Sequence, residues 1–211
     1  VVAGPGLLQF YDIKDPKEIN LLSTVQNPNS GWYYGITMND THVYYIDSQF
    51  KFTVVDYTNR SEPKMVKQMG LNNRTGFADV YCPILIDNMF YGCPRNEDIF
   101  YIIDISDPLN PVVAKEMSLG TKAGAFTISG SKAYVASIPN GSQNLLSFDV
   151  VNKTNFKQVN AYHGEGFYAL CINIIKDRYI IYNDYGAIRC FDMNGSIDVS
   201  GMPAVPNESA V

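Results

Sequence analysis

The chain has 211 residues, of which 46% are hydrophobic and 18% are charged, and its formal net charge is −5. This hydrophobic content is typical of a globular protein and not of a disordered one. The acidic balance disfavours nucleic acid or an anionic membrane surface as a partner, because both select basic patches. No apolar run approaches the roughly 18–20 residues of a transmembrane segment. The chain begins at Val1, without Met, so we expect a processing event or a truncation at the N-terminus.

An apolar run that ends in Asp recurs five times along the chain. The repeated residues are Asp12, Asp56, Asp104, Asp149 and Asp192, at intervals of 43 to 48 residues. A period of roughly 40–45 residues, with a few short strands in each unit, is the signature of a β-propeller blade. The 15 Tyr and 11 Phe also favour strands. We therefore predict an all-β protein: a β-propeller of four-stranded antiparallel blades, about four and a half of them in this chain.

The predicted blades follow one another in chain order. A half blade occupies 1–26, and a weak last strand with a C-terminal tail occupies 195–211. Because residues 7–26 provide only the last two strands of a blade, we expect missing upstream sequence and a complete ring of six or seven blades. The four full blades are predicted at 27–70, 71–118, 119–163 and 164–194. Their predicted strands are 32–38, 43–46, 50–56 and 64–69; 77–86, 89–93, 99–105 and 112–117; 125–129, 133–136, 144–150 and 156–161; and 167–175, 179–183, 187–192 and a weak one near 197–199.

Three of the repeats carry a motif of known type. Residues 102–111 read Ile-Ile-Asp-Ile-Ser-Asp-Pro-Leu-Asn-Pro, residues 11–16 are similar, and residues 55–63 form a weaker copy. This pattern resembles the LVIVD repeat, an apolar strand followed by Asp-Ile-Ser-x-Pro-x-x-Pro. The copies at Asp149 and Asp192 keep only the Asp. The resemblance implies a β-propeller, commonly on secreted or cell-surface proteins, and implies no single activity because fold alone does not fix function.

The repeated Asp is the most obvious catalytic candidate, but a structural role is the better interpretation. An Asp at the point where a strand turns can accept a hydrogen bond from the backbone N–H two residues on. A residue present in every blade serves the blade, whereas a catalytic residue is needed once. We therefore predict no catalytic residue among the five, and expect Asp104→Ala to lower stability without abolishing binding.

The loops that enter the predicted inner strands are the best candidates for a ligand site. A Gly precedes the strand in each blade, as at Gly31, Gly76, Gly124 and Gly166. The alternatives are a tight loop with an aromatic side chain packed between blades, and ordinary solvated charges. The candidate ligand-binding residues are Trp32, Arg74, Asp79, Lys122, His163 and Glu165.

Enzyme motifs are scarce. The two His residues, His42 and His163, show no zinc-ligand spacing, and neither a G-x-S-x-G elbow nor a P-loop occurs. We predict no cofactor and no metal. An enzyme with its site in the central channel, a hydrolase or lyase acting on carbohydrate, remains an alternative. It would need Arg74, Asp79, His163 and Glu165 to converge on one pocket with perturbed protonation.

The cysteines predict one disulfide. Cys82 and Cys93 flank the predicted turn at Asp87 and Asn88 symmetrically, so they should be direct cross-strand neighbours within disulfide range. The alternative is a pair of buried thiols. Cys171 and Cys190 are predicted on the first and third strands of one blade, which leaves their redox state and partners open.

Seven Asn-x-Ser/Thr sequons occur, more than the composition gives by chance, and the first six fall in predicted turns, where a glycan can be accommodated. The competing explanation is turn composition: Asn59 and Asn152 each lie three residues after a repeated Asp, where Asn is favoured in any case. We predict glycosylation of several sites. The sequons are at Asn39, Asn59, Asn73, Asn140, Asn152, Asn194 and Asn207.

Sequons and the predicted disulfide together point outside the cytosol. The sequence thus predicts an extracellular or cell-surface β-propeller glycoprotein that acts as a binding or assembly module for a protein or glycan partner. It could be a subunit of a repeating extracellular structure that self-associates across an exposed sheet edge. A third interpretation, after the channel enzyme, is an intracellular scaffold with reduced cysteines and unmodified sequons.

Overall fold

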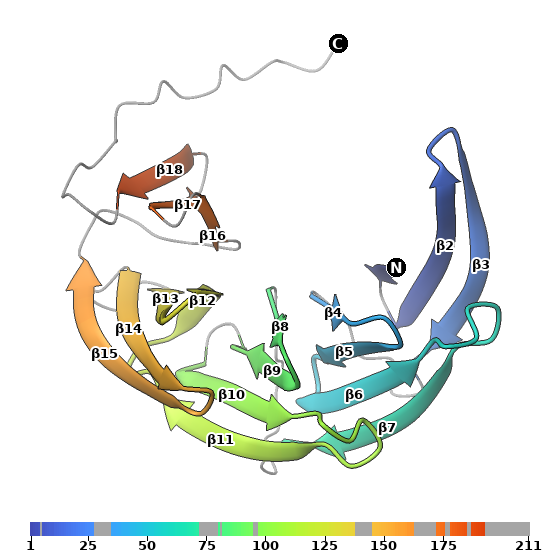
Figure 1. Cartoon of the computed structure of the whole chain (residues 1–211), viewed down its shortest axis with the longest axis horizontal. Helices are drawn as coiled ribbons and strands as arrows, with labels where there is room; N and C mark the ends of the chain where they lie inside the picture. The colour runs from blue at the N-terminus through green and yellow to red at the C-terminus, as the bar shows by residue number, and fades with distance from the viewer. Residues whose placement is uncertain are drawn as a thin grey trace. The chain divides into compact units, whose positions relative to one another are not determined.

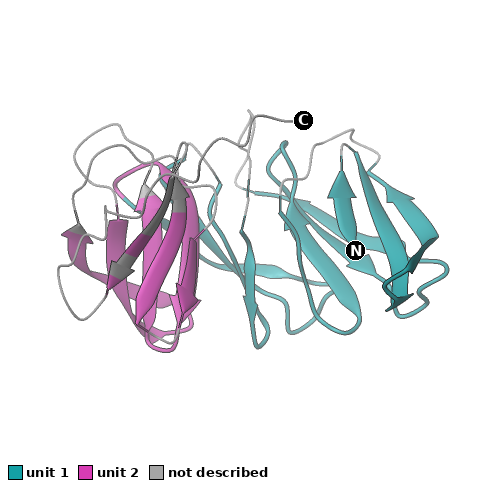
Figure 2. Cartoon of the chain, turned by 90° about the horizontal axis from the view of Figure 1, so that it is seen from above, with its two compact units in different colours: residues 1–119 teal, residues 120–211 magenta. Residues whose placement is uncertain are grey.

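All regular structure in the described part of the protein is β-strand. The computed structural model describes residues 1–4, 6–27, 35–71, 80, 82–94, 97–137, 145–162, 172–175, 178–184 and 187–192. The strands form five antiparallel sheets, which confirms the predicted all-β class and its four-stranded units. The chain divides into two compact units, Val1–Leu119 and Gly120–Val211 (Figure 2).

The first sheet of the first unit has three strands in the order β1-β2-β3. They are β1 (Val2–Gly4), β2 (Leu7–Asp15) and β3 (Glu18–Gln26). The prediction gave this sheet two strands and missed β1, because three residues are too short for an alternating pattern to be recognised. A register shift between Phe10 and Tyr11 gives the β2–β3 hairpin a bulge.

The second and third sheets of this unit each have four strands and follow the first sheet in chain order (Figure 1). Of the predicted inner strand at 77–86, the described residues form a strand over Ile84–Ile86, directly after Pro83, which has no N–H to donate to a ladder. The second sheet contains β4 (Thr37–Met38), β5 (His42–Ile46), β6 (Lys51–Asp56) and β7 (Lys64–Gly70). The third contains β8 (Ile84–Ile86), β9 (Met89–Gly92), β10 (Ile99–Asp104) and β11 (Val112–Ser118).

The β8–β9 hairpin has the register that the sequence predicts. Ile86 pairs with Met89 and Ile84 with Tyr91, so Asp87 and Asn88 form a two-residue turn. Asp87 adopts a φ of 51°, in the left-handed region that Asp tolerates better than most residues.

The core of the first unit lies between its sheets, and the strand β6 contributes to both layers. Phe52 and Val54 belong to a cluster with side chains of the third sheet, whereas Val55 packs in a cluster with side chains of the first sheet. Residues 52–55 are all buried, which explains why the strand reads as a continuous run and not as an alternation.

A buried carboxylate joins the first two sheets. Asp47 has no exposed surface, and its Oδ2 accepts a hydrogen bond of 3.2 Å from Asn27 Nδ2. Its Oδ1 accepts hydrogen bonds from the backbone N–H groups of Gln49 and Lys51, at 2.9 and 3.0 Å. Three donors compensate for the loss of hydration of this charge.

The second unit contains two sheets, with the strand orders β12-β13-β14-β15 and β16-β17-β18. Tyr134 and Leu145 of the first of these sheets pack with Ile180 and Tyr182 of the other. The four-stranded sheet contains β12 (Ala123–Ser129), β13 (Lys132–Ser137), β14 (Leu145–Asn152) and β15 (Asn155–Tyr162). The three-stranded sheet contains β16 (Ile172–Ile175), β17 (Tyr179–Asp184) and β18 (Ala187–Asp192).

Candidate functional site

The repeated Asp holds a turn in the first three copies, as the sequence predicts. The backbone N–H of Lys14 donates to Asp12 Oδ1 at 3.0 Å, that of Thr58 to Asp56 Oδ1 at 2.8 Å, and that of Ser106 to Asp104 Oδ1 at 2.8 Å. The hydrogen bonds from the Thr58 N–H and hydroxyl lower the pKa of Asp56 below its usual range. These carboxylates are therefore committed to the backbone of their own hairpins.

In the last two copies the described residues include a cation that binds the carboxylate. Lys132, the cross-strand partner of Asp149, donates to Asp149 Oδ1. Arg178 donates to Asp192 from Nε at 3.1 and 3.0 Å and from Nη2 at 2.6 Å. These hydrogen bonds and the opposite charge raise the pKa of Arg178. None of the five Asp side chains is thus an unengaged acid or base.

A second turn of the same kind lies three residues after the repeated Asp in four copies. The acceptor Oδ1 belongs to Asp15, Asn59, Asp107 or Asn152, and the donor is the backbone N–H two residues on, at 2.9 to 3.2 Å. Two copies therefore use a carboxylate and two use an amide. The turn requires only the side-chain oxygen that these two groups share.

One face of the first sheet remains partly exposed. Alternation along β2 places Leu7, Gln9 and Tyr11 on this face, and the register adds Val2 opposite Gln9 and Leu21 opposite Tyr11. Val2 and Leu21 are each 52% exposed, and the other three are half-buried. We call these five residues the open sheet face.

The other face of the first sheet is covered. Leu8, Phe10 and Val25 are 0%, 4% and 9% exposed and pack with residues of the second sheet. Phe10 lies against Tyr57 with a centroid separation of 5.7 Å. The two faces of one sheet thus differ sharply in burial.

The next two sheets show what covers the equivalent of the open sheet face. Counting back from the repeated Asp, Gln9 and Tyr11 correspond to Thr53 and Val55 in β6 and to Tyr101 and Ile103 in β10. All four of these equivalents have 0% exposure. Thr53 even pairs with Gln68 across the strands, as Gln9 pairs with Thr24. The open sheet face therefore has the position that a neighbouring sheet covers elsewhere in this chain.

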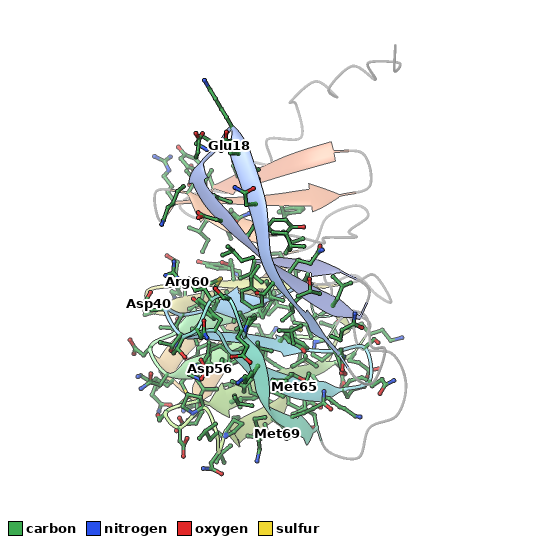
Figure 3. All side chains as sticks on the ribbon, turned by 90° about the vertical axis from the view of Figure 1, so that its right-hand side faces the viewer. Glu18, Asp40, Asp56, Arg60, Met65 and Met69 are labelled. Atoms are coloured by element: carbon green, nitrogen blue, oxygen red, sulfur yellow. The ribbon has the colours of Figure 1, made fainter. Side chains whose placement is uncertain are left out.

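A pocket lies where the β2–β3 hairpin meets the turn after β6. Its volume is about 360 Å³, and Ser23 Oγ donates to the Arg60 carbonyl at 3.1 Å across the two sheets. Figure 3 shows this side of the first unit, with Glu18 at the tip of the hairpin and Arg60 on the turn of the second sheet. Two cationic side chains and an apolar surface meet here. The pocket is lined by Tyr11, Asp12, Ile13, Lys14, Leu22 and Arg60.

Sequence reasoning did not single out this pocket or the open sheet face. The pocket brings Arg60 beside Lys14, and only the packing of two sheets reveals that proximity. The partial exposure of β2 had no clear signal in the sequence: Gln9 stands where three other repeats carry Thr53, Tyr101 and Leu146, but the last repeat carries Arg189.

Most of the predicted ligand-binding residues lie outside the described residues. These are Trp32, Arg74, Asp79, His163 and Glu165, so their convergence stays a prediction, as does the channel enzyme that depends on it. Lys122 is described: it is exposed and directly precedes β12.

The predicted Cys82–Cys93 disulfide is absent from the structure, in which both residues are thiols. The register has the predicted symmetry, but the ladder ends at the pair Ile84–Tyr91, and Pro83 separates it from Cys82. Cys93 is buried, and its Sγ donates to the Ile99 carbonyl at 3.6 Å. Burial also raises the pKa of the Cys93 thiol and so keeps it protonated. Cys190 is a half-buried thiol, and Cys171 lies outside the described residues.

Three of the seven sequons can be placed. Asn39 lies between β4 and β5, Asn59 between β6 and β7, and Asn152 at the end of β14; all three are exposed. The sequons at Asn73, Asn140, Asn194 and Asn207 lie outside the described residues.

The described residues contain no group of three or more His, Cys, Asp and Glu side chains that could hold a metal ion. They also contain no helix with the length and apolar character of a membrane span.

Comparison with solved structures identifies the class of protein. The periplasmic gluconolactonase PpgL from Pseudomonas aeruginosa is similar with a TM-score of 0.72 and 12% identity, over 88% of this chain and 59% of its own. BamB from Moraxella catarrhalis is similar with a TM-score of 0.61 and 13% identity, over 89% and 52%. A chain of a mitotic checkpoint complex matches with a TM-score of 0.65 and 11% identity, over 85% and 55%.

These neighbours are β-propeller-like, and the protein has the β-propeller fold. The chain spans little more than half the length of these three structures. Its sequence matches no family model and no curated protein. At identities of 11–13% the likeness establishes the fold alone, so the LVIVD resemblance stays a prediction.

Proposed function

We propose that the protein is an extracellular or cell-surface β-propeller glycoprotein that acts as an assembly module, and that it self-associates through the open sheet face. The observation that carries the proposal is the partial exposure of this face, since its equivalents in β6 and β10 are completely buried. A non-cytoplasmic location rests on the excess of sequons, and one solved neighbour is itself described as periplasmic.

A second copy of this chain is the occupant that fits best. In the first two sheets, the residues two and four positions before the repeated Asp pack with the following sheet, as Phe10 and Leu8 do in the first and Val54 and Phe52 in the second. The corresponding position in the last sheet is Cys190, paired with Ile181, and both are half-buried. The chain thus carries two incompletely covered sheet faces. One is the open sheet face, and the other is the face of the last sheet that carries Cys190 and Ile181. Contact between unlike faces of successive copies is heterologous and can propagate into a repeating structure.

The charges of the pocket can act locally on a second copy. Lys14 and Arg60 line the pocket together with Asp12, and a carboxylate of the second copy placed against the two cations would make association dependent on salt. The net charge of −5 on each copy opposes association at long range.

Sedimentation velocity across the micromolar range tests the proposal with a matched pair of variants. Leu21 and Leu109 are 52% and 54% exposed, but only Leu21 lies on the open sheet face. We expect the unmodified chain to form oligomers as its concentration rises. Leu21→Asp should weaken this association at least tenfold, because a buried carboxylate without a partner is costly, and Leu109→Asp should leave it unchanged. A chain that stays monomeric, or equal effects of the two variants, would overturn the proposal.

A further inference from the structure

The hydrogen bonds of the three described sequons divide them into two kinds. We propose that Asn59 and Asn152 carry N-linked glycans and that Asn39 does not. This inference rests on the proposed passage of the protein through a secretory pathway. It deepens the proposed function by naming the modified residues.

The side-chain amide of Asn59 engages the protein through its oxygen. Oδ1 accepts the backbone N–H of Ser61 at 3.2 Å, and within the described residues Nδ2 of this exposed side chain donates no hydrogen bond. Asn152 has the same arrangement: its Oδ1 accepts the backbone N–H and the hydroxyl of Thr154, at 3.0 and 3.3 Å. In both sequons the nitrogen that would receive a sugar is available to solvent.

Asn39 uses both ends of its amide. Its Oδ1 accepts the backbone N–H groups of Thr41 and His42 at 3.1 and 2.8 Å and the Thr41 hydroxyl at 3.2 Å. Its Nδ2 donates to the hydroxyl of Tyr44 at 3.3 Å, and Tyr44 has 0% exposure. The Asn39 carbonyl also accepts the hydroxyl of Tyr57. A sugar on Asn39 Nδ2 would have to fit beside a hydroxyl that belongs to the core.

The repeats of this chain show that the fold does not need the amide nitrogen of Asn59 or Asn152. Asp15 and Asp107 occupy the same position, three residues after the repeated Asp, and accept the same backbone N–H through a carboxylate oxygen. Where the chain has Asn at this position, Ser or Thr follows two residues later and completes the sequon. Two copies of the turn thus carry an exposed Nδ2 group, and the two copies with Asp form the same turn without an amide nitrogen.

The modification is a group transfer from a lipid-linked oligosaccharide pyrophosphate. The Asn Nδ2 attacks the anomeric carbon of the first sugar, and a nitrogen–carbon bond forms. The bond from that carbon to the pyrophosphate oxygen breaks, the lipid pyrophosphate leaves with the electron pair, and Nδ2 loses one proton to a base. Neither Asn59 nor Asn152 belongs to the open sheet face.

Expression of the full chain behind a cleavable secretory leader in eukaryotic cells tests the assignment. Chain recovered from total membranes and medium would be digested, and glycopeptides would be mapped by mass spectrometry with and without enzymatic removal of N-glycans. We expect Asn59 and Asn152 to be occupied and Asn39 to be unmodified. The double variant Asn59→Asp, Asn152→Asp should lose the mass of two glycans without a shift in melting temperature, because Asp15 and Asp107 already hold such turns.

Asn39→Asp is the matched control. It keeps the oxygen that accepts the turn hydrogen bonds but removes the donor to Tyr44, so we expect an unchanged glycan mass and a lower melting temperature. Glycan on Asn39, or bare Asn59 and Asn152 in chain recovered from the secretory pathway, would overturn the inference. Sedimentation of enzymatically deglycosylated chain tests self-association separately, so failure of one proposal is distinguishable from failure of the other.

Discussion

The repeated Asp is held by different partners in the two units. In the first unit, Asp12, Asp56 and Asp104 each accept a backbone N–H two residues on. In the second unit, Asp149 and Asp192 are held by the cations of Lys132 and Arg178. The same repeated residue therefore has two different kinds of partner in one chain.

The difference shows what the repeat selects for. A carboxylate at the end of the third strand lies beside the first residues of the second strand, and the pairs His42–Asp56 and Lys132–Asp149 fix that geometry. Asp56 and Asp104, which have the Asp-x-Ser/Thr pattern, accept a backbone N–H, and so does Asp12, which has Lys14 two residues on. Asp149 and Asp192 bind a basic side chain. The repeat thus preserves an anion at this position and allows its partner to change.

Among variants that test the two ways of holding the repeated Asp, Arg178→Met should have the largest effect on the free energy of unfolding. The side chain of Asp192 is only 8% exposed, and Arg178 binds it through two nitrogens while lying 5.0 Å over the ring of Tyr179. Removal of the cation leaves a buried carboxylate, so we expect a loss of about 2 kcal/mol in the free energy of unfolding. Hydrogen exchange of β17 and β18 should rise, while exchange of β10 and β11 stays unchanged; a loss of protection confined to β10 and β11 would contradict this.

A smaller loss is expected from Asp104→Ala. The variant removes the acceptor for the Ser106 N–H, an exposed hydrogen bond, so we expect a loss of about 1 kcal/mol, as for other capping side chains. Self-association should be unaffected, because Asp104 does not lie on the open sheet face. Urea unfolding and sedimentation velocity check the two parts; full stability with lost association would show that the repeated Asp is functional.

The strands β6 and β10 could be predicted from the sequence because both of their faces are buried and the repeat gives the register. The runs 52–55 and 100–103 are completely buried, so apolar residues mark them without any knowledge of their neighbours. The short strand β1 could not be found, since three residues carry no period. The chemistry of the turns was also predictable, because an Asx turn depends only on residues two apart.

The surfaces could not be predicted, because they depend on which sheet packs against which. Tyr11 and Val55 occupy the same position in their repeats, yet one is half-buried and the other has 0% exposure. Similarly, only the fold places Tyr44 beside the Asn39 amide. The structure does not show the Cys82–Cys93 bridge; the β8–β9 ladder ends before Cys82, at Ile84, and pairing symmetry alone does not take Pro83 into account.

Lowering the pH should separate the contribution of Asp56 to stability from that of Asn59, whose amide oxygen holds the next turn. The hydrogen bonds from Thr58 lower the pKa of Asp56 in the folded state, so its contribution to stability is present above the unfolded pKa of about 3.9 and is lost as pH falls through the folded value. Asp56→Asn should therefore cost stability at neutral pH and progressively less as the pH falls below about 4. Asn59→Gly at the neighbouring turn removes no titrating group and should show a cost independent of pH. Urea unfolding at several pH values checks this; a cost of Asp56→Asn that grows with acid would refute it.

The smallest effect is expected from Lys132→Met. Lys132 and Asp149 form the second ion pair of this kind, but their side chains are 47% and 43% exposed. Solvent and salt screen such a pair, so its loss should cost no more than about 0.5 kcal/mol and should vanish at high ionic strength. The cost of Arg178→Met should persist there, because Asp192 is shielded from the screening ions. Thermal unfolding of both variants at low and high salt measures the contrast. Equal salt dependence would mean that burial of the carboxylate does not set the strength of these pairs.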